Sequence, residues 1–187
     1  MIETKIIDNF LPKDVFDNFV NPLLRGEIPL HYVYSEKVDF FQFEHRYYNQ
    51  KLIDVGSETL YCCGSSTQTF DAVAPVTALI GRAIVEHTHP SEVALVRAKI
   101  NVVPRTGTKM QEGFHTDLSS PHAVGLLYMN TTNGPTVFED GEEIDSVENR
   151  LVIFDGLRPH TSSSCTDKKI RAAFNTNYFV IEDRAVE

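Results

Sequence analysis

Two residues in the segment 111–117 have the types and the spacing of metal ligands. His115 and Asp117 are two positions apart. We predict a β-strand over residues 114–118, and in a strand the side chains of residues two apart point to the same face. An imidazole nitrogen and a carboxylate oxygen would then lie side by side, where both can bind one metal ion.

A second histidine and an arginine follow later in the chain. The apolar run 151–155, bounded by Gly156, predicts a buried strand and leads to His160. Arg171 comes eleven residues after His160, at the start of another strand-like segment. The order is therefore His-x-Asp, then a distal His, then an Arg on the following strand.

This ordered set indicates a particular kind of iron site. Two histidines and one carboxylate leave open positions on the metal, which suits non-haem Fe(II) because it must hold a cosubstrate and O2 together. A guanidinium grips a carboxylate with two hydrogen bonds. A keto acid that chelates iron at one end presents a carboxylate at the other. We therefore predict His115, Asp117 and His160 as iron ligands and Arg171 as the partner of 2-oxoglutarate.

The ordered set resembles the 2-oxoglutarate/Fe(II)-dependent dioxygenases, and most closely their prolyl 4-hydroxylase-like branch. The resemblance spans most of the chain, and its specificity lies in the order, since His-x-Asp alone is a weak signal. The further matching segments are residues 7–12, 98–107, 125–130, 134–138 and 151–155.

The resemblance implies roles for further residues. Tyr128 is expected to hydrogen-bond the same carboxylate as Arg171, although a core tyrosine with another partner is an alternative. Thr136 is expected to line the cosubstrate pocket, and Asn101 to reach the cosubstrate from the strand before His-x-Asp. Asn175 faces the same way as Arg171 on a strand and is expected to add a hydrogen bond to the cosubstrate.

The resemblance also implies an activity, the hydroxylation of an unactivated C–H bond. Fe(II) would be the metal, 2-oxoglutarate and O2 the cosubstrates, and ascorbate a supporting reductant. A peptidyl proline is the leading substrate, but collagen-type prolyl hydroxylases carry Lys where this chain has Arg171, and a small molecule such as a free amino acid stays open. Two alternatives are a non-catalytic, cupin-like metal-binding jelly roll that binds a ligand, and a cupin-like isomerase or metal hydrolase.

The strand pattern predicts the fold that would bring these residues together. From residue 92 onward, short strand-like segments alternate with turn residues, which favours a sandwich or barrel. We predict a mainly β protein with flanking helices, a double-stranded β-helix or jelly roll, because this fold holds ligands in its mouth. Helices are expected from Pro12 to Gly26 and from Asp71 to His87.

Length and charge restrict the remaining possibilities. A chain of 187 residues predicts one domain, with residues 1–92 as a support region and 93–181 as the jelly-roll core. The net charge of -9 argues against nucleic-acid partners and anionic membranes. With no apolar leader and no C-x-x-C pair, we expect a cytoplasmic protein that acts on a peptide or small molecule.

One aromatic-rich segment, residues 32–48, has two interpretations. Its tyrosines and phenylalanines could form a wall over the iron site that grips substrate. Aromatic residues are also enriched in ordinary sheet packing, and we favour that interpretation. His87 and His89 have no Asp and distal His in order with them, and His122 follows Pro121 in a loop, so we leave all three outside the metal site.

Overall fold

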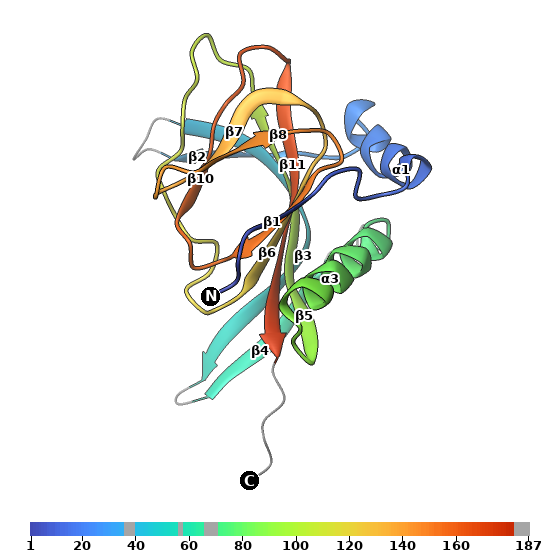
Figure 1. Cartoon of the computed structure of the whole chain (residues 1–187), viewed down its shortest axis with the longest axis vertical. Coiled ribbons are helices and arrows are strands. Elements are labelled where there is room, and N and C mark those ends of the chain that lie inside the picture. Colours follow the sequence, from blue (N-terminus) through green and yellow to red (C-terminus); the bar gives the residue numbers. More distant parts are fainter. Residues whose placement is uncertain (36–39, 56–57, 66–70, 182–187) are drawn as a thin grey trace.

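A computed structural model shows how the chain builds its sheets (Figure 1). It describes residues 1–35, 40–55, 58–65 and 71–181, without the side chains of residues 35 and 49–65. No helix in these residues is long and apolar enough to cross a membrane.

A large antiparallel sheet forms the body of the molecule. Its strands lie in the order β1-β9-β6-β11-β5-β3-β2, and β4 pairs with β3 beyond this path. The strands are β1 (Lys5–Ile7), β2 (His31–Ser35), β3 (Phe40–Val55), β4 (Glu58–Ser65), β5 (Glu92–Pro104), β6 (Ala123–Tyr128), β9 (Leu151–Asp155) and β11 (Ile170–Ile181).

A second, smaller sheet completes the sandwich. It consists of β10 (His160–Ser162), β7 (Thr132–Phe138) and β8 (Glu143–Ser146), in that order. Two antiparallel sheets with flanking helices confirm the predicted jelly-roll class. The sequence analysis missed β8, because its four residues alternate an acid with Ile144 or Ser146 and so lack the apolar run that marked the other strands.

Two helices cover one side of the large sheet (Figure 1). Helix α1 (Lys13–Leu24) follows Pro12, and Gly26 with a φ of 72° ends this segment as predicted. Helix α3 (Ala74–Thr88) begins three residues later than predicted, with Val73 rather than Asp71 at its N-cap. Proline in the first turn of α3 fits this start, since its missing N–H costs no helical hydrogen bond.

Strand β5 of the large sheet has one apolar face and one polar face. On β5, Ala98, Ile100 and Val102 are buried in the core beneath the helices. The alternate residues Arg97 and Lys99 point to the opposite face, toward the small sheet, where they line a cavity. The fold thus directs a row of polar side chains into the space between the sheets.

Candidate metal centre

His115 and His160 are joined by their backbones. Each backbone N–H donates to the other residue's carbonyl, at 3.1 and 3.0 Å, so the two residues form an isolated antiparallel bridge. The predicted strand over residues 114–118 is therefore wrong. Strand β10, the neighbour of the His115 segment, is only three residues long, so the two cannot form a longer ladder. The same strand also pairs with β7, where His160 lies opposite Phe138.

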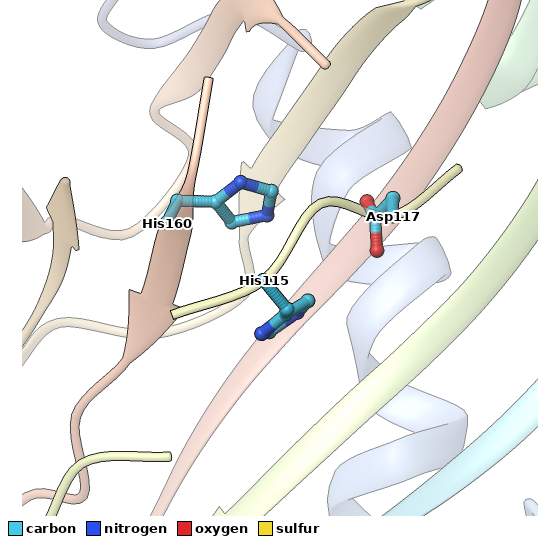
Figure 2. A group of neighbouring side chains, drawn as sticks. All are labelled: His115, Asp117 and His160. Carbon is cyan, nitrogen blue, oxygen red and sulfur yellow. The ribbon is translucent and has the colours of Figure 1, made fainter. Parts of the chain in front are cut away.

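The three predicted ligands converge at this bridge. One ligand atom from each of His115, Asp117 and His160 lies within 4.8 Å of the other two. Figure 2 shows His115 and Asp117 on one irregular segment and His160 on β10, with the side chains gathered around a common space. His115 and Asp117 therefore lie close together on a short irregular segment, where a regular strand was expected.

Backbone carbonyls orient both imidazoles. The Nδ1 of His115 lies 3.0 Å from the carbonyl oxygen of Gly113, and the Nδ1 of His160 lies 3.0 Å from that of Arg158. A carbonyl oxygen only accepts, so each Nδ1 carries the proton and each Nε2 keeps a free lone pair for a metal. Burial also lowers the pKa of His160, which favours the neutral ring that a metal requires.

The Asp117 carboxylate is held by three side chains. The amide groups of Asn175 and Asn177 donate to its Oδ2 at 3.0 and 2.9 Å, and Arg97 forms an ion pair with its Oδ1. Burial opposes ionisation of Asp117, but the positive charge of Arg97 and the other donors hold the pKa of this carboxyl well below its usual value. Asp117 is therefore ionised and fixed in orientation.

A second group of polar residues surrounds Arg171, which is only 2% exposed. Its guanidinium donates to the carbonyl of Gly134 at 2.8 Å, to Oγ of Ser146 at 3.0 Å and to Oγ1 of Thr136 at 2.8 Å. Among the side chains that the structure describes, no carboxylate pairs with Arg171. A buried cation bonded only to neutral groups is costly, so the site lacks an anion that a ligand can supply.

One cavity of about 270 Å³ connects the two groups. Its lining includes all three predicted metal ligands together with Arg171 and Thr136. Ala173 also lines the cavity, and its small side chain leaves room for a ligand. The cavity therefore offers a metal-binding position and an anion-binding position in one continuous space.

Comparison with solved structures finds the same architecture in other proteins. A 2OG-Fe(II) oxygenase family oxidoreductase from Burkholderia pseudomallei has a TM-score of 0.68 at 12% identity, over 97% of this chain and 88% of that one. A Pseudomonas putida prolyl-4-hydroxylase gives 0.59 at 15%, over 96% and 93%. HygX from Streptomyces hygroscopicus, solved with nickel and 2-oxoglutarate bound, gives 0.63 at 9%, over 97% and 85%.

The chain has the fold of the 2OG-Fe(II) oxygenases. Its His-x-Asp and distal His lie together within that fold, as the resemblance in the sequence implied. No family model and no curated protein matches the chain. The likeness therefore establishes the fold, and the chemistry must be argued from the residues of this site.

The remaining predicted residues of the oxygenase site fall into two groups. Tyr128 is buried and donates its hydroxyl to Thr136 Oγ1 at 2.7 Å, so both residues belong to the Arg171 group. Asn101 lines the cavity, and its buried Oδ1 has no partner in the described part of the chain. Asn175 lines the cavity as well, but it donates to Asp117, so the structure places it beside a metal ligand rather than with Arg171.

The three histidines that were left out of the site do not belong to the metal cluster. Nε2 of His87 bonds the carbonyl of Glu3 at 2.8 Å, and His89 caps α3. His122 is buried with its Nδ1 2.7 Å from the carbonyl of Ser120.

For the rings that the structure describes, the interpretation of residues 32–48 as an aromatic wall over the iron site is wrong. Tyr32, Phe41 and Phe43 pack against one another with centroids 5.8–6.4 Å apart. Their strand neighbours Val33 and Gln42 line the cavity instead. Because side chains alternate along a strand, the aromatic rings point to the other face of the sheet.

Sequence reasoning missed a charged row beside the metal centre. Arg97 and Lys99 on β5 line the cavity, and so do Glu44 and Arg46 on the neighbouring β3. The signal was present in β5, where two cations and Asn101 occupy every second position of an otherwise apolar strand. Such an alternation predicts a polar face that the interior of the sandwich must use.

Proposed function

We propose that this protein is a 2-oxoglutarate- and Fe(II)-dependent oxygenase that hydroxylates an unactivated C–H bond. The observation that supports this most is the pairing of a three-ligand metal set with a buried, anion-deficient Arg171 in one cavity. Two imidazoles and a carboxylate are a donor set that suits Fe(II) and leaves coordination positions open.

His115, Asp117 and His160 would hold the metal. Iron, with 2-oxoglutarate and O2, supplies the oxidising chemistry. The chain supplies positioning, because the histidine tautomers are set by backbone carbonyls and Asp117 is fixed by Arg97 and two amides. These features prepare the ligands before the metal arrives.

Arg171 and Thr136 would bind the distal carboxylate of 2-oxoglutarate. The Tyr128 hydroxyl donates to Thr136, and burial raises the pKa of Tyr128, so this donor keeps its proton. Ser146 Oγ in turn donates to the Gly134 carbonyl at 2.7 Å, which holds another acceptor of the guanidinium. The carboxylate would thus meet a rigid set of donors.

The alternatives fit the site less well. A structural metal usually has four protein ligands, whereas the described residues offer three. An isomerase or hydrolase that works without a keto acid has no need of the buried cation Arg171. Peptidyl proline stays a candidate substrate, since the Pseudomonas putida relative is a prolyl-4-hydroxylase.

The test measures binding before turnover. Calorimetry should show that Mn(II) binds the purified chain, that 2-oxoglutarate binds only when metal is present, and that His115→Ala removes both. With Fe(II), O2 and ascorbate, the protein should convert 2-oxoglutarate to succinate. Failure of 2-oxoglutarate to bind the metal-loaded chain would overturn the proposal.

A further inference from the structure

The charged row at the β3 side of the cavity lies beside the metal centre. Lys99 pairs across the sheet with Asn175, the residue that bonds Asp117, and on its other side with Arg46. Arg97 lies on the same strand and bonds Asp117 directly. A molecule held by this row would therefore lie next to the metal.

Among the described residues, Glu44 is the one acid that forms ion pairs with both Lys99 and Arg46. Glu44 lies 3.3 Å from the Lys99 ammonium and 2.6 Å from the Arg46 guanidinium, and its side chain is 7% exposed. Lys99 is itself 12% exposed, and burial together with the charge of Arg97 lowers its pKa. A single shared carboxylate leaves this pair of cations with one uncompensated positive charge.

The whole cavity has the same imbalance. In the part of the chain that the structure describes, the cations lining it are Arg46, Arg97, Lys99 and Arg171, against the acids Glu44, Glu112 and Asp117. Fe(II) and the 2-oxoglutarate dianion cancel each other, so loading the site leaves one positive charge. In a chain whose net charge is -9, this local excess is specific to the cavity.

We propose that the substrate is a small molecule carrying one carboxylate, which Lys99 and Arg46 bind. This rests on the proposed function, because it assumes that Arg171 is neutralised by 2-oxoglutarate. A monoanion matches the excess charge, whereas a phosphate dianion would exceed it and meet Glu44. An internal proline of a peptide is neutral and would leave the excess positive charge of this pair uncompensated.

The dimensions of the cavity agree with a small substrate. Its volume of about 270 Å³ must hold 2-oxoglutarate as well, and pockets for drug-sized ligands alone are about 300–1,000 Å³. Lys99 lies on the wall of this cavity, while Arg46, with 56% of its side chain exposed, lies at the solvent side. A small carboxylic acid with no positive charge of its own, such as an N-acetylated amino acid, can reach both.

Matched pairs of ligands test the inference. The chain loaded with Mn(II) and 2-oxoglutarate is titrated by calorimetry with the N-acetylated proteinogenic amino acids, their primary amides and a proline peptide capped at both ends. At least one acid should bind roughly tenfold more tightly than its amide, as expected for a hydrogen-bonded charge. The same acid should stimulate succinate formation in the Fe(II) protein, and its amide should not.

Variants assign the preference to Lys99. In Lys99→Met the acid should lose its advantage over the amide, in Lys99→Arg the advantage should return, and the Kd of 2-oxoglutarate should stay within about twofold of wild type. Lys168→Met, at an exposed position, is the matched control. Thermal melting verifies that each variant is folded.

Two outcomes would overturn the inference while leaving the oxygenase proposal intact. One is normal 2-oxoglutarate binding with no acid preferred over its amide, including the case in which only the capped peptide binds. The other is an acid preference that Lys99→Met leaves unchanged. Loss of 2-oxoglutarate binding in the wild type would instead count against the proposed function itself.

Discussion

His115 and His160 accept each other's backbone N–H groups, so two ligands 45 residues apart in sequence are fixed to one another before any metal is bound. This bridge, with a second one between Gln111 and Ser163, places the irregular segment 111–115 beside β10 of the small sheet. It also places the two imidazole rings with centroids 5.1 Å apart. The metal centre is therefore a continuation of the sheet structure, and its geometry depends on that sheet.

Metal and then cosubstrate should each raise the stability of the folded chain. Mn(II) at a hundred times its Kd should raise the free energy of unfolding by about 2.7 kcal/mol, because it binds only the folded site. Adding 2-oxoglutarate should raise the melting temperature further in the presence of metal and leave it unchanged with EDTA. Equal shifts with and without metal would contradict chelation at this centre. Thermal melts with each addition provide the measurement.

Arg171→Met should separate cosubstrate binding from metal binding. The Kd of 2-oxoglutarate should rise at least tenfold, since a charge-assisted pair is lost, while the affinity for Mn(II) stays near the wild-type value. Stability without ligands should change little, because Ser146 still donates to Gly134 and Tyr128 still donates to Thr136. Calorimetry and melting curves measure the two effects. Large unfolding of the ligand-free variant would show that Arg171 is structural instead.

Arg97→Met should weaken metal binding without removing a ligand. Arg97 and Asn177 hold Asp117, and loss of such an outer partner typically costs about 10–100-fold in metal affinity. The measurement is Mn(II) affinity by calorimetry. Arg82→Met, which removes an exposed arginine from α3, serves as the control and should bind Mn(II) normally. Unchanged affinity in Arg97→Met would show that Asp117 is held adequately by the amides alone.

The metal-free protein should lose stability in acid through Asp117. Its pKa is lower in the folded chain than the usual 3.8, so its contribution is fully present above pH ~4 and is lost as the pH falls toward the folded value. Urea unfolding in EDTA between pH 6 and pH 2.5 measures this slope. Asp117→Asn should be less stable at pH 6 and should show a shallower decline below pH 4. Parallel curves for the two proteins would assign the acid sensitivity to other carboxylates.

Gly156→Ala should destabilise the chain near the metal centre. A Cβ at Gly156 would lie 2.0 Å from Nε2 of His122, whose ring is buried. Overpacking of this kind costs about 1–3 kcal/mol, measurable as a lower melting temperature. Gly107→Ala is the matched control, because a Cβ there meets nothing within 4 Å. Equal melting temperatures for both variants would mean that the His122 ring moves aside freely.

The sequence predicted which residues form the site better than it predicted the backbone structure that positions them. His115, Asp117, His160 and Arg171 were identifiable because their order and chemistry are distinctive. The bridge between the two histidines was not predictable, because it depends on a three-residue strand finding a partner 45 residues earlier. A local pattern describes a strand's own alternation but carries no information about which distant segment lies beside it.

The same limit explains the other omissions. Ser146 reaches Arg171 from β8, a strand too short and too acidic to be recognised from its sequence. Arg97 and Lys99 lie on a strand that was predicted correctly, but the role of each depends on which side chains of other strands it contacts. Only the assembled sandwich shows that Arg97 meets Asp117 and that Lys99 shares Glu44 with Arg46.

The ion pair between Arg97 and Asp117 has a consequence for the order of biosynthetic events. An acidic ligand that already has a counter-ion within the protein creates no electrostatic obstacle to folding, so maturation need not wait for iron. Small zinc domains behave in the opposite way, since they stay unfolded until their ion is supplied. On the proposed function, this chain would complete its tertiary structure first and bind ferrous ion afterwards.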